Sequence, residues 1–463
     1  MDLKTSHAEL YDYLKKLSIY DIRNIARAKG AATPTTGKKE EIIDRIVRVC
    51  AGVDAPIDVS NSSGKGAPPK STAKQEHLEA ISKIMDYIDS KSIIVVPQRD
   101  TDKIIFADSG EIEKADYEKD FVSGLVDFVA GKYYLALNNY GTDYEFELPI
   151  ELIKEYSLRV GDKVVAIYEE TGEGPKIEKI TGVNFTSPEQ CGKRINFNDA
   201  LPCFTNEKID FSQFDKSFLA LDMINPIGKG QRALITAPPA SGKTMLVNGM
   251  VNSLASGSPV AIVLLLVGAR PEELSLYKNY ISAIELFATT FDDSAKKQVK
   301  VATLAFEHAK RLMENKQDVI IFVDGVVDLA YAFAELNQNN VSTSEIKKLF
   351  AIAKNTENSG SITVVATIRE EQDVGALSVY RELKRTASVE LVLSKKFCDR
   401  RIFPPFDFTN SYNYSLDKLL SNKEIEAVGI IKNQLKQTDD LLSLYEQAQD
   451  CSSAVELVEK FAR

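Results

Sequence analysis

Residues 232–255 read RALITAPPASGKTMLVNGMVNSLA, and this stretch decides the fold of the chain. An apolar run at 233–235 leads into a proline-rich turn, then Ser241-Gly-Lys-Thr244, then apolar residues at helical spacing. This order predicts a strand, a phosphate-binding loop and a helix. The backbone N–H groups of such a loop, next to a helix N-terminus, can hold a phosphate chain. The stretch therefore predicts that the chain binds a nucleoside triphosphate.

Two side chains of this loop predict specific contacts with the nucleotide. Lys243 would reach the β- and γ-phosphates, and the Thr244 hydroxyl would bind Mg²⁺. The usual first glycine of the loop is Ala237 here, and Gly-Lys-Thr alone also occurs at ordinary helix starts. The flanking strand and helix nevertheless favour the nucleotide-binding interpretation. The expected nucleotide-binding residues of the loop are Pro238, Pro239, Ala240, Ser241, Gly242, Lys243, Thr244 and Met245.

A second segment supports this interpretation. Residues 318–324 read DVIIFVD, which is typical of a buried strand that ends in a carboxylate. If this strand lies beside the loop in a parallel sheet, Asp324 can hold the Mg²⁺ through water. Thr244 and Asp324 are therefore the predicted metal-binding residues.

Length and composition are those of an ordinary multidomain globular protein. At about 150 residues per domain, the 463 residues suggest roughly three domains. No apolar run is long enough to span a bilayer, and the N-terminus does not read as a signal peptide. The cysteines at 50, 191, 203, 398 and 451 show no paired spacing, and three histidines offer no metal cluster. Reduced thiols and a cytoplasmic location are expected.

The first 50 residues carry a net positive charge, unlike the chain as a whole. They hold ten Lys and Arg against seven Asp and Glu, whereas the net charge of −10 argues against a broadly basic nucleic-acid binder. Apolar stripes at helical spacing predict a compact helical unit over residues 1–50. Its layout of helix, glycine, Pro34-Thr-Thr-Gly-Lys-Lys-Glu-Glu41 and helix resembles the SAP-type nucleic-acid-binding fold. Lys38 and Lys39 would contact phosphates; the alternative is a small docking module with solvated lysines.

Residues 51–74, rich in Ser, Gly and Pro, predict a flexible linker. Over residues 75–185, a helical pattern at 75–92 and short strand-like runs predict a small antiparallel barrel of the oligonucleotide-binding, cold-shock-like type. Bases stack on aromatic rings in such barrels, so Phe128, Lys132 and Tyr133 are the expected RNA contacts. The alternative is that Phe128, Tyr133 and Tyr134 alternate between core and surface. The strand-like runs are Ile93–Val96, Ile104–Ala107, Gly124–Val129, Tyr133–Leu137 and Val164–Ile167.

Residues 220–244, ALDMINPIGKGQRALITAPPASGKT, resemble the nucleotide loop of the Rho family of bacterial transcription termination factors, which also starts with alanine. The helical unit, the barrel and the turn Arg159-Val-Gly-Asp162 also stand where this family has them. Further family motifs follow in the same order, namely Arg270-Pro-Glu-Glu273, Thr290-Phe-Asp292, Ala309–Leu312, Asp318–Asp324, Gly360–Thr367, Leu393–Lys396 and Arg401–Pro404.

The resemblance implies a multidomain α/β protein with a RecA-like P-loop ATPase domain over residues 186–463. It further implies a ring-shaped hexamer, single-stranded RNA and RNA polymerase as partners, and ATP with Mg²⁺ as cofactors. The implied activity is RNA-dependent ATP hydrolysis that drives a helicase or translocase. Arg270 joins the expected nucleotide-binding residues.

Positions that carry the family's chemistry differ in this chain. Ala269 stands where the family has the glutamate that polarises the attacking water, and Asn410 stands at its trans-acting arginine. The arginines expected after the magnesium aspartate are replaced in Asp324-Gly-Val-Val-Asp328-Leu-Ala-Tyr331. Losing a general base costs about 10²–10⁴ in rate, and losing an arginine finger about 10³–10⁵.

The segments expected to grip RNA differ as well. One channel loop is short around residues 338–343, and the other, Arg369–Ala376, lacks the expected lysine. In the barrel, Gly131-Lys-Tyr-Tyr-Leu135 keeps an aromatic residue at Tyr133 but not at Leu135.

Three interpretations stay open at this point. The favoured one is a Rho-like termination factor that binds ATP and RNA, forms a ring, acts on nascent transcripts and hydrolyses ATP slowly. The others are a fully active RNA-dependent translocase, and a nucleotide-binding regulatory paralogue without motor activity. Substitutes for the missing groups would come from Arg369, Lys384 or Arg385 as cation and from Glu272 or Asp292 as base.

Overall fold

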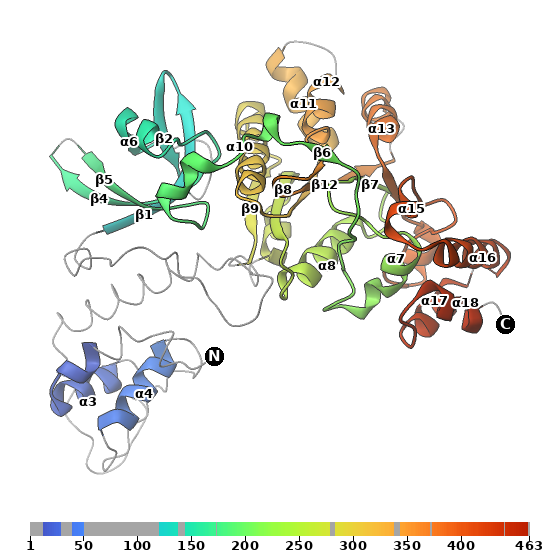
Figure 1. Cartoon of the computed structure of the whole chain (residues 1–463), viewed down its shortest axis with the longest axis horizontal. Helices are drawn as coiled ribbons and strands as arrows, with labels where there is room; N and C mark the ends of the chain where they lie inside the picture. The colour runs from blue at the N-terminus through green and yellow to red at the C-terminus, as the bar shows by residue number, and fades with distance from the viewer. Residues whose placement is uncertain are drawn as a thin grey trace. The chain divides into compact units, whose positions relative to one another are not determined.

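The computed structural model describes residues 13–28, 39–50, 120–137, 144–172, 174–277, 283–337, 343–370, 373–438 and 440–461. The described residues before 51 belong to one compact unit, and those from 120 onward belong to another (Figure 1). Lys38, the predicted linker, the helical pattern at 75–92 and the strand-like runs at 93–96 and 104–107 lie outside the described residues.

The N-terminal unit contains helices α3 (Ile19–Ala28) and α4 (Lys39–Cys50). Both are amphipathic, and Leu14, Ile22 and Ile42 belong to their shared buried core. The Lys39 ammonium donates hydrogen bonds of 2.7 Å each to the backbone carbonyls of Lys15 and Leu17. Lys39 thus stabilises the fold of its own unit, and its predicted phosphate contact and the SAP-type fold stay predictions.

The second unit starts with a five-stranded antiparallel sheet in the order β3-β2-β1-β4-β5, which we call the small sheet. The runs predicted at 124–129, 133–137 and 164–167 correspond to β1, β2 and β4. A two-residue turn with positive φ at Ala130 and Gly131 joins β1 to β2, as tight hairpins require. Whether the small sheet is an oligonucleotide-binding barrel stays a prediction. Its elements are β1 (Asp120–Val129), β2 (Lys132–Ala136), β3 (Phe146–Leu148), α6 (Ile150–Glu155), β4 (Lys163–Thr171) and β5 (Gly174–Val183).

The remainder is built on a seven-stranded sheet in the order β14-β13-β7-β12-β10-β8-β9, which we call the large sheet. All pairs are parallel except β13 with β14. Parallel strands with helical crossovers produce the α/β architecture that the sequence predicts. The strands are β7 (Arg232–Ala237), β8 (Ala261–Ala269), β9 (Glu285–Thr290), β10 (Val319–Asp324), β12 (Ile362–Arg369), β13 (Val389–Val392) and β14 (Tyr412–Asn413).

Two hydrophobic cores lie on the two faces of the large sheet. Along β10, Ile320 and Phe322 belong to one core and Ile321 and Val323 to the other, because successive side chains of a strand point to opposite faces. The first core includes α7 (Leu219–Ile224), α8 (Lys243–Ala255), α16 (Asn422–Thr438), α17 (Leu441–Ala448) and α18 (Ala454–Phe461). The second includes α10 (Ala295–Glu314), α11 (Val326–Asn337), α12 (Thr343–Phe350) and α13 (Val374–Thr386). Short elements are β6 (Pro202–Cys203), α9 (Pro271–Leu274), β11 (Asn355–Thr356), α14 (Lys395–Asp399) and α15 (Leu416–Leu419). Within the described segments, no helix combines the length and apolarity needed to cross a bilayer.

Buried charges join the small sheet to the large-sheet domain, mainly through α10. Asp162 accepts a 2.6 Å hydrogen bond from Arg194. Glu314, at the end of α10, accepts hydrogen bonds from Arg159 (3.0 Å) and Arg311 (2.9 Å). Burial raises the pKa of Glu314 although Arg311 and Arg159 act in the opposite direction. We call these five residues the ionic joint.

Gly161 lies against α10 beside the ionic joint. Its carbonyl oxygen is 2.8 Å from His308 Nδ1, and burial lowers the pKa of that imidazole. The φ of Gly161 is +90°, and an added Cβ would lie 2.6 Å from the Glu307 carbonyl carbon. A side chain at position 161 would therefore meet both backbone strain and the backbone of α10.

We predict that Gly161→Ala destabilises the contact between the small sheet and α10. Gly131→Ala is the matched control, because Gly131 also has a positive φ (+88°) but nothing lies within 4 Å of an added Cβ. Gly161→Ala should cost about 1–3 kcal/mol more than the control, which is the usual cost of overpacking. Urea unfolding of the full chain measures the difference, and equal losses for the two variants would contradict the proposed crowding.

Candidate nucleotide-binding site

The candidate site lies where four neighbouring strands of the large sheet end. Parallel pairing places the ends of β7, β12, β10 and β8 at one edge, with Arg369 opposite Ala237 and Asp324 opposite Leu266. Ligands of open parallel sheets bind at the carboxyl ends of their strands. The fold therefore brings together residues that are far apart in the sequence.

The phosphate loop has the predicted order of strand, turn and helix. β7 ends at Ala237, and α8 begins at Lys243. Ala240 and Gly242 have positive φ values of 57° and 78°, and the Ser241 hydroxyl donates a 2.7 Å hydrogen bond to the Pro238 carbonyl. Of the eight predicted loop residues, Lys243 and Thr244 line the cavity described below. Nucleotide contacts of the others, including the exposed Met245, stay predictions.

A short polar chain connects the loop to the neighbouring strands. The Lys243 ammonium pairs with the Asp324 carboxylate. The Thr367 hydroxyl on β12 donates a 2.7 Å hydrogen bond to the same carboxylate oxygen and lies 3.4 Å from Lys243 Nζ. Because Asp324 is buried, these two partners stabilise a charge that would otherwise be costly. The sequence assigned Thr367 no role, although it ends the motif Gly360–Thr367 and lies near the end of an apolar strand.

A cavity of about 360 Å³ opens at this edge of the sheet. Its walls come from the ends of β8, β10 and β12 and from the first turns of α8 and α11. Charged and hydroxyl side chains dominate the part next to the loop. The lining includes Lys243, Thr244, Arg270, Asp324, Asp328 and Arg369.

The donor set at the loop fits Mg²⁺. The Thr244 hydroxyl and the Asp324 carboxylate both line the cavity, and Mg²⁺ prefers oxygen ligands from one or two protein groups together with phosphates and water. Among the described residues, no group of three His, Cys, Asp or Glu side chains is placed to hold a metal by itself. Thr244 and Asp324 would therefore hold the ion jointly with a nucleotide.

Arg270 is the N-cap residue of α9 and follows Ala269, where the resemblance predicts a glutamate. Its backbone N–H donates a 3.2 Å hydrogen bond to Glu273, and both residues line the cavity. Ala269 is 8% exposed and ends β8. A methyl group at this position can neither take a proton nor orient a water molecule.

Asn410 lies in a local turn that is not part of the cavity lining. Its side-chain amide donates a 2.7 Å hydrogen bond to Asp407, and its backbone N–H donates to the same carboxyl group. A trans-acting residue would have to reach the site of a second copy of the chain. Asn410 carries no charge for that purpose.

The structure separates the five candidate substitutes. Arg369 lines the cavity. Lys384 instead pairs with Glu390 (3.0 Å), and Arg385 lies 3.9 Å from Glu382. Glu272 and Asp292 do not line the cavity. Asp328, from the segment in which the expected arginines are replaced, also lines the cavity.

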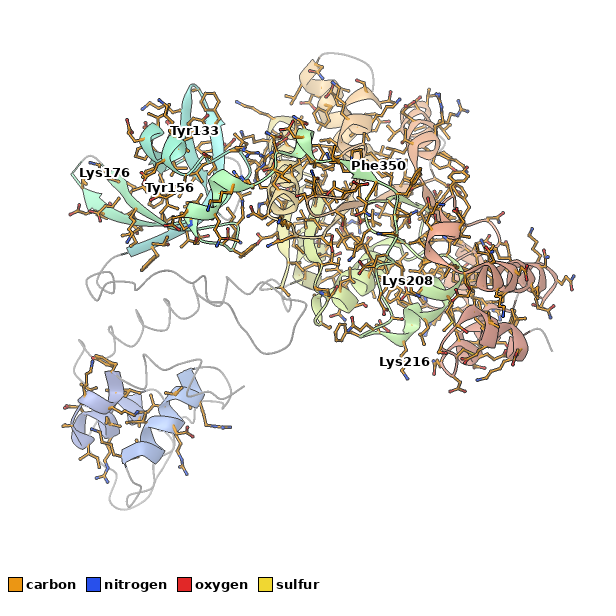
Figure 2. All side chains as sticks on the ribbon, in the orientation of Figure 1. Tyr133, Tyr156, Lys176, Lys208, Lys216 and Phe350 are labelled. Carbon is orange, nitrogen blue, oxygen red and sulfur yellow. The ribbon has the colours of Figure 1, made fainter. Side chains whose placement is uncertain are left out.

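The RNA contacts predicted in the small sheet, Phe128, Lys132 and Tyr133, lie on the hairpin of β1 and β2. Phe128 and Tyr133 are directly opposed across the two strands, and their ring centroids lie 4.8 Å apart. Phe128 is 48% exposed, whereas Tyr133, labelled on β2 in Figure 2, also packs against the core of the small sheet. Lys132 forms a 2.7 Å ion pair with Glu147. Tyr134 packs against Tyr144 instead.

One further aromatic residue near the loop was missed from the sequence. The Phe403 ring is 41% exposed, and it approaches α8, since a Cβ on Gly249 would lie 3.1 Å from its edge. Its signal in the sequence was the motif Arg401-Ile-Phe-Pro404.

Comparison with known proteins decides the family. The transcription termination factor Rho of Cereibacter sphaeroides is 30% identical over 331 residues, which cover 66% of this chain and 78% of that protein. The chain belongs to the Rho family. Rho of Escherichia coli (strain K12) is 33% identical over 302 residues, covering 60% of this chain and 71% of that protein.

The nucleotide-binding domain matches a wider family too. Residues 217–413 match the nucleotide-binding domain of the ATP synthase alpha/beta family. Among solved structures, a prototypical ATPase from the type III secretion system of pathogenic bacteria has a TM-score of 0.48 and 21% identity, covering 57% of this chain and 86% of that chain. The family match over residues 217–413 identifies this part of the chain as a nucleotide-binding domain.

We predict that Lys243→Ala strongly weakens nucleotide binding. Hydrogen bonds to charged groups contribute about 1.5–3 kcal/mol each, so the Kd for a fluorescent ATP analogue with Mg²⁺ should rise by about 10- to 100-fold or more. Asp324→Asn should weaken binding less. Lys348→Ala, on an exposed pair with Glu345, is the control. Unchanged affinity in a folded Lys243→Ala protein would exclude this site.

Proposed function

We propose that this chain is a Rho-like transcription termination factor that binds ATP with Mg²⁺ and single-stranded RNA, and that hydrolyses ATP slowly. It would act on nascent transcripts in the cytoplasm as a homo-oligomeric ring, in contact with RNA polymerase. Membership of the Rho family supports this proposal.

The observation that carries the proposal is that the groups predicted to bind the nucleotide line one cavity, whereas the groups expected to act in catalysis are replaced. Lys243, Thr244 and Asp324 converge on it and serve a nucleotide that is merely bound. Ala269 and Asn410 stand where groups that act in the transition state are expected. Only interactions that are stronger in the transition state accelerate a reaction. Binding is therefore expected to persist while turnover falls.

The small sheet supports the RNA part of the proposal. The exposed Phe128 ring lies against Tyr133, so two aromatic faces are available at one hairpin. Lys132 lies on the same strand, in an exposed ion pair with Glu147 that a phosphate could replace. Such a combination of aromatic rings and basic groups holds single strands with little sequence preference. In the N-terminal unit, Lys38 and Lys39 are the proposed phosphate contacts.

We predict that Ala269→Glu and Asn410→Arg together raise RNA-stimulated ATP turnover by more than either change alone. The two groups serve one transition state, so their effects should not be additive. Steady-state phosphate release, with and without single-stranded RNA, measures the turnover of the unmodified chain, the two single variants and the double variant. Brisk RNA-stimulated hydrolysis by the unmodified chain would overturn the proposed slow turnover and favour a working translocase.

We predict that Tyr133→Ala weakens oligonucleotide binding by about 1–3 kcal/mol, the usual value for one stacked base. Tyr134→Ala is the matched control, because the adjacent side chain points to the opposite face of the strand and packs against Tyr144. Fluorescence anisotropy with a labelled single strand at low salt measures both variants. Equal effects of the two substitutions would argue against stacking on Tyr133.

A further inference from the structure

Apart from Glu273, which accepts a hydrogen bond from the Arg270 backbone, the cavity lining holds one carboxylate and one guanidinium that the binding of a nucleotide and Mg²⁺ does not account for. These belong to Asp328 on α11 and Arg369 at the end of β12. Both lie on the same chain as Lys243. Asp328 offers a carboxylate base and Arg369 a cation, and Ala269 and Asn410 can supply neither.

Asp328 enters the cavity beside the position of the missing glutamate. It lies in the first turn of α11, which follows β10 directly after Asp324 and Gly325. A Cβ built on Gly268 would lie 3.4 Å from the Asp328 Cβ and 3.8 Å from its Oδ2. Gly268 immediately precedes Ala269. The Asp328 carboxylate therefore reaches the end of β8 from a neighbouring helix.

The backbone of β8 is adapted to this approach. Its pairing with β9 shifts register between Leu266 and Ala269, and Gly268 has a φ of +63°. Such irregularities near strand ends re-aim side chains. Position 268 has no side chain, and a Cβ there would touch the Asp328 side chain.

Arg369 faces the phosphate loop from the other side. It pairs with Ala237, the last residue of β7, and the next residue, Glu370, donates a 2.9 Å hydrogen bond to the Ala237 carbonyl. Residues two apart on a strand share a face. Because Thr367 contacts both Lys243 and Asp324, Arg369 lies on the face that carries the phosphate-binding groups.

We propose that Asp328 orients the water that attacks the γ-phosphate and that Arg369 supplies, from the same chain, the cation that stabilises the transferring phosphoryl group. This proposal rests on the proposed binding of ATP in the cavity. It assigns the slow turnover to a carboxylate from α11 and an arginine in cis, in place of a glutamate on β8 and an arginine from a neighbouring subunit.

The reaction balances with these groups alone. The water oxygen forms a bond to Pγ while the bond from Pγ to the β,γ-bridging oxygen breaks. The bridging oxygen keeps the electron pair and leaves with ADP. The water proton passes to the Asp328 carboxylate and from there to solvent, since Asp328 is exposed. Arg369 acts on the negative charge of the equatorial oxygens.

Binding of a transition-state analogue tests the charge of Arg369 independently of turnover. The affinity for ADP with aluminium fluoride should fall at least tenfold in Arg369→Gln, while the affinity for ADP alone stays within about twofold. Arg385→Gln is the matched control, because Arg385 is an exposed arginine outside the cavity lining. Equal analogue affinities in the wild type and in Arg369→Gln would overturn the role of Arg369.

Single-turnover hydrolysis tests Asp328. Asp328→Asn should slow the step by about 10²-fold or more, as expected for a lost base, and Asp328→Glu should restore part of the rate. Glu272→Gln is the control from outside the cavity lining. The same Asp328→Asn change should weaken the aluminium fluoride complex but not the ADP complex. An Asp328→Asn protein that matches Glu272→Gln in both measurements would overturn the role of Asp328.

Mixing two variants separates action in cis from action in trans. Arg369→Gln chains keep Lys243, and Lys243→Ala chains keep Arg369. A mixture should not regain the analogue affinity if Arg369 serves its own chain, whereas recovery would overturn the cis assignment. Failure of the unmodified chain to bind ADP or ATP at all would instead reject the proposed function, and this proposal with it.

Discussion

The candidate site depends on one buried carboxylate. Asp324 ends the strand β10 and is held between the Lys243 ammonium and the Thr367 hydroxyl, so the ends of β7, β10 and β12 are fixed around it. An unpaired charge at this depth would cost several kcal/mol, about 3–5 when one partner of a buried pair is removed. Lys243 pairs with this charge. If a nucleotide and Mg²⁺ bind as proposed, the phosphates would interact with the lysine and the metal with the carboxylate.

The site divides into a part that recognises the ground state and a part that acts later. Lys243, Thr244 and Asp324 line one cavity, and their nucleotide and Mg²⁺ contacts stay predictions. By contrast, the side chains that would act on the reacting phosphate differ from those that the family resemblance predicts. Methyl and amide groups stand where the resemblance to the Rho family predicts a base and an arginine, and we propose that a carboxylate from α11 and a guanidinium from β12 act in their place. Such a division lets nucleotide affinity and turnover change independently of each other.

Sequence patterns predicted the parts of this molecule that are continuous along the chain. Strand, loop and helix around Ser241–Thr244 and the buried strand ending in Asp324 were visible because apolar periodicity and a short motif lie within a few residues. Thr367, Asp328 and Arg369 were harder to place, because their proximity to Lys243 results from the strand order β7-β12-β10-β8. From the sequence, Arg369, Lys384 and Arg385 were equal candidates for the substitute cation, but only Arg369 lines the cavity. The oligonucleotide-binding and SAP-type folds, and the domain boundaries, stay predictions.

The ionic joint has a consequence for how this protein can be divided. A cut at residue 186, where the P-loop domain is expected to begin, would leave Asp162 and Arg159 on one fragment and Arg194, Arg311 and Glu314 on the other. Asp162 would lose Arg194 and Arg159 would lose Glu314, whereas Glu314 would keep Arg311. The surface of α10 that Gly161 covers would face water. We therefore expect the small sheet and the large-sheet domain to fold as one unit rather than as independent domains. An expression fragment intended to isolate the nucleotide-binding part should start upstream of β1 and retain the small sheet.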